Sequence, residues 1–258
     1  NGFPSQMYHP MLAPLTHDYH VVSLLPRALW SNQTPPAALM DWKEMVMRDL
    51  LDGLRAIDAR DVILVGHSFG GIASMLAVIE EPQRFRGLIL LDPTILPHAV
   101  LDAIRTLNTA GRIHELPLAA RALKRRRHFL SRDEAYVYFK SRPLFADWDE
   151  RMVRAYVDEG LRTTPDGVEL LWSPEWEAYY YMGGYGGTYE DLPRLKGLVP
   201  TLMIRGANSD TFVSDTVDEV RALVPDAHYV EIANHGHLFP MSAPRQTADT
   251  IRDFAARL

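Results

Sequence analysis

The sequence contains no cysteine, and that absence removes several kinds of chemistry. Disulfides, thiol nucleophiles and cysteine-based metal sites are all excluded. No apolar run approaches the roughly 18 residues of a membrane-spanning helix. No basic stripe is present either, and a net charge of -6 argues against a nucleic-acid partner. The longest basic run, residues 124–127, is interpreted as a solvated helix face.

The chain begins without a methionine and without a strand-like run. Residues 1–5 are Asn-Gly-Phe-Pro-Ser, which predicts a turn. No signal peptide is recognisable, which favours a cytoplasmic location. We expect further residues, forming additional strands, to precede Asn1 in the natural protein.

A chain of 258 residues can bury a sizeable core, which favours one domain with an insertion. Short apolar runs alternate with helical patterns along most of its length. Such alternation predicts a mostly parallel sheet with helices on both faces. The predicted strands are residues 20–25, 62–65, 87–91, 200–205 and 228–232.

Residues 94–192 depart from this alternation. They contain periodic helical stretches and no convincing strand, so we expect an all-helical cap between two parts of a core, residues 1–93 and 193–258. The glycine-rich residues 183–187 predict a hinge at the end of the cap. The many aromatic side chains either form the cap's own core or roof a substrate pocket. The aromatic residues predicted to contact substrate are Phe139, Trp172, Trp176 and Tyr179.

The most informative stretch is residues 66–71, Gly-His-Ser-Phe-Gly-Gly. It lies between a predicted strand and a predicted helix, where Gly66 and Gly70 give room for a sharp turn. The turn exposes the Ser68 hydroxyl for attack and places the Phe69 N–H beside it to stabilise an oxyanion. The G-x-S-x-G pattern alone fixes only three residues and can occur by chance, but the strand and helix around it favour the functional interpretation. His67, directly before the serine, is interpreted as a structural residue.

Two further side chains follow the last two predicted strands. In an open α/β sheet, ligands bind at the carboxyl ends of the strands. Asp210 follows one of these strands, and His237 follows the other. The chain order Ser, Asp, His predicts that His237 takes the proton of Ser68 and that Asp210 orients the imidazole.

Together these motifs resemble the α/β-hydrolase family. Residues 66–71 match its nucleophile turn, G-x-x-S-D at 206–210 its acid loop, and G-H-L-F-P at 236–240 its histidine loop. The resemblance covers nearly the whole chain. It implies an α/β-hydrolase fold with a helical cap and an acyl-enzyme mechanism that needs neither a metal nor an organic cofactor.

The resemblance also assigns the site residues. It places the catalytic histidine at His237, before an apolar residue and a proline, and makes His235 the decoy. It places the acid at Asp210, with Asp92 as the fallback because some relatives carry their acid after that strand. Asn1-Gly2-Phe3 stands where the family typically has His-Gly-x, which implies the Phe3 N–H as a second oxyanion donor.

Two departures from the family pattern narrow the branch. Residues 25–28 read Leu-Pro-Arg-Ala where many relatives have Asp-x-Arg-Gly, which argues against the best-known esterase, lipase and dehalogenase branches. Asn1 replaces histidine, but the oxyanion donor is backbone and is therefore retained. Ser68 argues against haloalkane dehalogenases and epoxide hydrolases, which use aspartate there.

The sequence therefore predicts a serine hydrolase that cleaves an ester-like bond of a small apolar substrate. A lactonase, a C–C bond hydrolase or a perhydrolase would use the same residues, because the pocket selects the substrate. A hydrolase-derived binding protein with little turnover is the alternative from another class. Neither the substrate nor the oligomeric state follows from these motifs.

Overall fold

The computed structural model describes residues 1–31 and 33–258. Its main sheet contains four parallel strands in the order β1–β2–β6–β7. These strands confirm all the predicted ones except the first. Their bounds are β1 Val62–His67, β2 Phe85–Leu91, β6 Thr201–Gly206 and β7 His228–Ile232.

The two central strands are buried on both faces. Every residue of β6 is buried, and so is every residue of β2 except Arg86. Successive side chains of a strand point to opposite faces. Leu88 and Leu90 accordingly belong to one hydrophobic core, and Ile89 and Leu91 to another. Unbroken apolar runs therefore fit strands that are covered on both sides.

Helices cover both faces of this sheet. Side chains of α2, α3 and α10 contribute to the first core, and side chains of α1, α11 and α12 to the second. The bounds are α1 His9–Leu12, α2 Arg48–Ala56, α3 Phe69–Glu80, α10 Ser214–Leu223, α11 Phe239–Ser242 and α12 Pro244–Ala255. Short 3-10 turns are η1 Ser5–Tyr8, η2 Ala13–His17, η3 Arg27–Leu29, η5 Pro82–Arg84, η6 Ile113–Glu115, η7 Pro143–Phe145 and η8 Leu192–Leu195, and η4 Lys43–Met47 is a π-helical turn.

Residues 20–25 form no strand, so this prediction is wrong. Leu24 packs against the first core and Val21 against the second, while Val22 and Leu25 are exposed. The apolar run therefore reflects packing of Val21 and Leu24 onto the two cores, without pairing to a neighbouring strand. Among the described residues, β1 consequently lies at one edge of the main sheet.

The chain between β2 and β6 is mainly helical, but it is not all-helical as predicted. Its strands β3 (His128–Phe129), β4 (Leu161–Thr164) and β5 (Gly167–Leu170) form a small antiparallel sheet in the order β3–β5–β4. Gly167 has a φ of 139°, and a Cβ there would collide with the carbonyl oxygen of Phe129. The helices are α4 His98–Thr109, α5 Pro117–Ala122, α6 Arg132–Lys140, α7 Glu150–Gly160, α8 Pro174–Met182 and α9 Thr188–Asp191.

The basic run at residues 124–127 is only partly a solvated surface. It lies beyond the end of α5, and Arg125 turns inward to pair with the buried Glu177 of α8. Arg127 forms an exposed pair with Glu175 on the same helix. The predicted helix face is therefore replaced by an irregular segment whose second residue is an internal cation.

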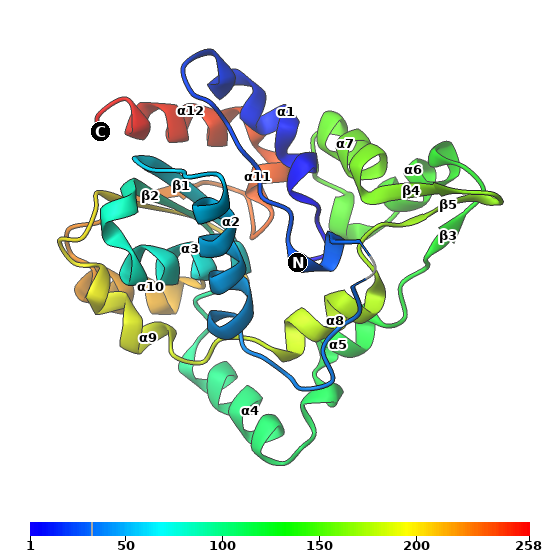
Figure 1. Cartoon of the computed structure of the whole chain (residues 1–258), viewed down its shortest axis with the longest axis horizontal. Helices are drawn as coiled ribbons and strands as arrows, with labels where there is room; N and C mark the ends of the chain where they lie inside the picture. Colours follow the sequence, from blue (N-terminus) through cyan, green and yellow to red (C-terminus); the bar gives the residue numbers. More distant parts are fainter. Residues whose placement is uncertain (32) are drawn as a thin grey trace.

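Figure 1 shows the main sheet and its helices on the left, and α5 to α8 with the small sheet on the right. The start of the chain lies between these two parts. None of the helices in the described part of the chain is long and apolar enough to cross a membrane.

Candidate active site

Ser68 lies in a sharp turn between β1 and α3. Its φ of 58° and ψ of -124° are unusual for a residue with a side chain, and such strain is common at functional sites. A Cβ on Gly66 would collide with the Gly70 carbonyl oxygen and lie 2.5 Å from Ser74 Oγ. A Cβ on Gly71 would meet Pro93 at 3.1 Å, whereas one on Gly70 would meet nothing within 4 Å. The turn therefore needs space at Gly66 and Gly71, not at Gly70 as predicted.

His237 connects this serine to a buried carboxylate. It lies in the loop after β7, with Nε2 2.9 Å from Ser68 Oγ and Nδ1 2.7 Å from Asp92 Oδ2. Because an ionised carboxylate only accepts hydrogen bonds, Nδ1 carries the proton in this pairing. Nε2 is then free to accept the hydrogen of the Ser68 hydroxyl.

Asp92 is fully buried at the end of β2 and is surrounded by donors. Its Oδ1 accepts a hydrogen bond from the Gly206 N–H at 2.9 Å. Its Oδ2 accepts one from the Ser209 hydroxyl at 2.5 Å, in addition to that from His237. A buried carboxylate requires such donors, because burial without them is costly.

Asp210, the predicted acid, does not contact His237 in the structure. It is exposed, and its carboxylate meets the Thr211 hydroxyl at 3.4 Å. Its neighbour Ser209 turns inward toward Asp92, and consecutive residues at this bend diverge, so Asp210 faces solvent. The structure thus brings the fallback residue, Asp92, to the imidazole in place of Asp210.

His235 does not approach the serine either. Its Nδ1 lies 2.7 Å from the hydroxyl of Ser242, at the end of α11. A Cβ on Gly206 would collide with the Gly236 carbonyl oxygen, so the absence of a side chain there lets the histidine loop pack against the end of β6. It is His237, and not His235, that lies within hydrogen-bond distance of Ser68.

Thr94 is a neighbour of the serine that the sequence motifs did not reveal. Its hydroxyl lies 3.4 Å from Ser68 Oγ, and its N–H donates to the Ser68 carbonyl at 3.3 Å. Thr94 lies two residues after Asp92. Only the choice of Asp92 as the partner of the histidine would have drawn attention to Thr94 in the sequence.

Two backbone N–H groups were predicted to bind an oxyanion, those of Phe69 and Phe3. Within the described part of the chain, neither donates a hydrogen bond to another group. Phe69 is the first residue of α3, where N–H groups point out of the helix end. Phe3 follows Gly2, which has a φ of 74°, and its ring packs 5.6 Å from the rings of both Trp148 and Tyr156.

The aromatic residues predicted to bind substrate lie in three different surroundings. Trp172 packs against Phe69, the residue after Ser68, with ring centroids 6.5 Å apart. Trp176 and Tyr179 instead connect α8 to the segment before α2. The Trp176 indole N–H donates to the Gln33 carbonyl, and the Tyr179 hydroxyl donates to the Ala38 carbonyl.

Phe139 belongs to a separate aromatic cluster. It packs against Phe129, Phe145 and Tyr156 at centroid distances of 5.0–5.3 Å. For Phe139 this arrangement fits the alternative in which the aromatic side chains of residues 94–192 form a core of their own.

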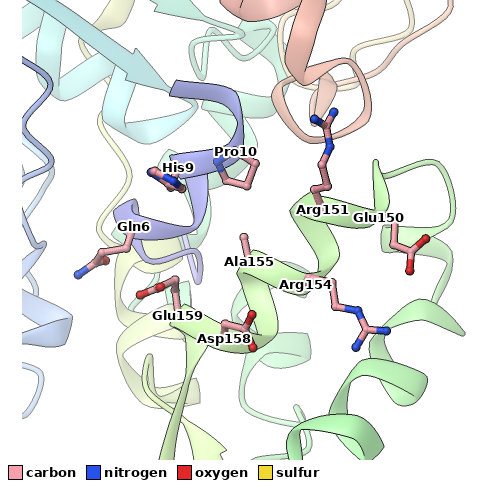
Figure 2. A pocket seen from close by; sticks show the side chains of 9 residues that line it. All are labelled: Gln6, His9, Pro10, Glu150, Arg151, Arg154, Ala155, Asp158 and Glu159. Atoms are coloured by element: carbon pink, nitrogen blue, oxygen red, sulfur yellow. The ribbon is translucent and has the colours of Figure 1, made fainter. Parts of the chain in front are cut away.

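A surface hollow of about 470 Å³ lies between α1 and α7 (Figure 2). Charged side chains of α7 and the polar side chains of Gln6 and His9 surround it. Neither Ser68 nor His237 lines it, so this hollow is not a space above Ser68.

A comparison with known protein families agrees with this geometry. A sequence model of the alpha/beta hydrolase family matches residues 1–250, so the chain is a member of the α/β-hydrolase family.

Two curated lipases share part of the sequence. Lipase LipV of Mycobacterium tuberculosis (strain ATCC 25618 / H37Rv) is 27% identical over 193 residues, which are 74% of this chain and 67% of that lipase. Monoglyceride lipase of Rattus norvegicus is 40% identical over 57 residues, which are 20% of this chain and only 19% of that lipase.

Solved structures share the fold over almost the whole chain. E-2-(acetamidomethylene)succinate hydrolase superposes with a TM-score of 0.78 at 18% identity, covering 99% of this chain and 88% of that one. The thioesterase domain from the curacin biosynthetic pathway superposes with a TM-score of 0.74 at 17% identity, covering 96% and 87%. At such identities the likeness establishes the fold alone.

Proposed function

We propose that the protein is a serine hydrolase that cleaves an ester-like bond of a small molecule through an acyl-enzyme. The observation that carries this proposal is the continuous chain of hydrogen bonds from Ser68 through His237 to Asp92, at 2.9 and 2.7 Å. The complete burial of Asp92 supports it, because a charge is rarely buried without a purpose that repays its desolvation.

Each residue then has one role. His237 accepts the proton of Ser68 as the serine oxygen bonds to the substrate carbonyl carbon. It returns that proton to the leaving alcohol as the ester bond breaks. Water, deprotonated by His237, then attacks the acyl-enzyme and releases the acid and the free serine. Asp92 holds the imidazole and stabilises its protonated form throughout.

The oxyanion donors are the N–H groups of Phe69 and Phe3. The proposal is supported by the absence of other partners for these groups among the described residues. Both N–H groups belong to backbone segments fixed by packing, so they need little reorganisation when charge develops on the carbonyl oxygen.

Residues 94–192 are the cap in this proposal, and they present an apolar surface to the acyl or alcohol group. The Phe69 ring packs against Tyr180, with centroids 5.4 Å apart, and against Trp172 of the same segment. Trp42 approaches Phe69 from the core side at 5.8 Å. The two lipases among the similar proteins favour carboxylic esters within this class.

Labelling with a fluorophosphonate tests this function directly. We expect stoichiometric modification of the wild-type protein at Ser68, because His237 makes the hydroxyl nucleophilic. Ser68→Ala should abolish labelling, and His237→Ala should slow it at least a hundredfold. Folded wild-type protein that takes up no label would favour a binding protein over an enzyme.

Activated esters of rising acyl length, run beside Ser68→Ala, test the substrate class. An apolar surface should raise kcat/KM by up to about fourfold for each methylene, which corresponds to about 0.8 kcal/mol. A flat or falling series from acetyl to hexanoyl would contradict the apolar surface. Labelling at Ser68 without turnover of any ester would redirect the search to lactones and C–C bonds.

A further inference from the structure

His67 lies beside the nucleophile and has a partner on each ring nitrogen. Its Nε2 is 3.0 Å from the backbone carbonyl oxygen of His237, and its Nδ1 is 2.7 Å from the hydroxyl of Tyr8. A carbonyl oxygen only accepts hydrogen bonds, so Nε2 carries the proton. In the neutral imidazole, Nδ1 then carries no proton and accepts the hydrogen of the Tyr8 hydroxyl. In the neutral state these two contacts select a single tautomer of His67, protonated at Nε2.

The surroundings of His67 favour this neutral form. Burial lowers the pKa of His67 well below its ordinary value, and the neighbouring His237 lowers it further. The rings of His67 and His237 lie 5.0 Å apart at an angle of 33°. A neutral His67 can therefore remain beside His237 when that residue becomes an imidazolium during turnover.

The carbonyl that His67 binds has no other partner in the described part of the chain. Backbone N–H groups bind the carbonyls of His235 and Gly236 on one side and Leu238 on the other, but none binds that of His237. The peptide group of His237 is therefore held by a residue outside its own loop. The side chain of His67 supplies this contact from the nucleophile turn itself.

We propose that His67 is a positioning residue for His237, held in its donating tautomer by Tyr8. The Nε2–H of His67 fixes the His237 backbone, so the imidazole stays within 2.9 Å of Ser68 Oγ while Asp92 binds its other nitrogen. This inference rests on the proposed role of His237 as the base. The two hydrogen bonds Tyr8–His67 and His67–His237 connect η1, β1 and the loop after β7.

The test compares three variants by fluorophosphonate labelling and by ester kinetics. His67→Leu removes the donor at similar volume, His67→Gln restores a side-chain N–H near the position of Nε2, and Tyr8→Phe removes only the tautomer-fixing hydroxyl. We expect His67→Leu to lower kcat and the labelling rate about tenfold to a hundredfold with little change in KM, as a displaced catalytic group does. Tyr8→Phe should show a smaller loss of the same kind, and His67→Gln should recover most of the activity.

His235→Leu is the matched control, because it removes a hydrogen bond from the same loop without touching the His237 carbonyl. It should leave kcat close to the wild-type value. Circular dichroism and thermal unfolding identify variants that fail to fold. If His67→Leu does not fold, the labelling rate and kcat of Tyr8→Phe test the inference instead. A folded His67→Leu or Tyr8→Phe that labels at the wild-type rate would overturn the inference. Wild-type protein that does not label at all would instead overturn the proposed function.

Discussion

Ser68 adopts its strained backbone because the residue two positions earlier has no side chain. The segment before the serine passes so close to the start of α3 that a Cβ on Gly66 would collide with backbone. Gly70 borders the same turn, but the space around it is open. The turn therefore depends on one particular glycine of the G-x-S-x-G motif.

Gly66→Ala and Gly70→Ala should consequently differ. Gly66→Ala forces the turn apart and should lower the free energy of unfolding by about 1–3 kcal/mol or more, with loss of labelling at Ser68. Gly70→Ala should change stability by less than about 1 kcal/mol, since alanine is the better helix former. Urea unfolding of both variants makes the comparison, and equal destabilisation would contradict the crowding at Gly66.

Ser68 and His237 could be predicted from sequence because each lies in a short motif whose neighbours define its surroundings. The acid could not be chosen in the same way. Asp92 and Asp210 both follow strands of the sheet, and chain order does not reveal which loop turns inward. Here the inward position after β6 belongs to Ser209, which donates to Asp92 and leaves Asp210 in solvent.

Helix α8 carries two ion pairs that look alike in sequence but differ in burial. The Glu177 side chain is 10% exposed and binds Arg125, which also binds the Tyr156 hydroxyl. The Glu175 side chain is 45% exposed and binds Arg127. The Arg125–Glu177 pair also packs closely against Gly2, where a Cβ would lie 3.0 Å from atoms of both side chains. Gly2 is next to Phe3, the proposed oxyanion donor.

Glu177→Gln should therefore cost far more stability than Glu175→Gln. Removing the Glu177 charge leaves the partly buried Arg125 without its counter-ion, which should cost about 2–4 kcal/mol. Removing the exposed pair of Glu175 should cost no more than about 1 kcal/mol. Thermal and urea unfolding measure both, and similar losses in the two variants would show that Arg125 finds water or another acceptor.

At the scale of elements, periodicity predicted the strands of the main sheet well because they are apolar on both faces. The prediction failed where apolar residues pack without pairing, at residues 20–25. It also missed the hairpin of β4 and β5, whose turn sequence Pro-Asp-Gly at residues 165–167 was a usable signal. Asp41 and Glu44 form a capping box, with reciprocal hydrogen bonds of 2.8 and 3.1 Å.

Across the whole molecule, the site is assembled from separate segments that meet at the carboxyl ends of the strands. Ser68 follows β1, Asp92 follows β2, Ser209 follows β6 and His237 follows β7. The parallel topology brings these loops together although they are far apart in sequence. The fold class and the edge of the sheet that holds the site were therefore predictable, whereas the partner of the imidazole depends on tertiary packing.

The paired kinetics of Asp92→Asn and Asp210→Asn test the central claim most directly. Both substitutions exchange a carboxylate for an amide of the same shape, and Asp210→Asn acts as the matched control on the neighbouring loop. Asp92→Asn should lower kcat by about 10³–10⁴, because the amide no longer holds His237 in the tautomer that accepts the serine proton. Asp210→Asn should leave kcat unchanged. A large loss in Asp210→Asn beside a nearly active Asp92→Asn would contradict the account.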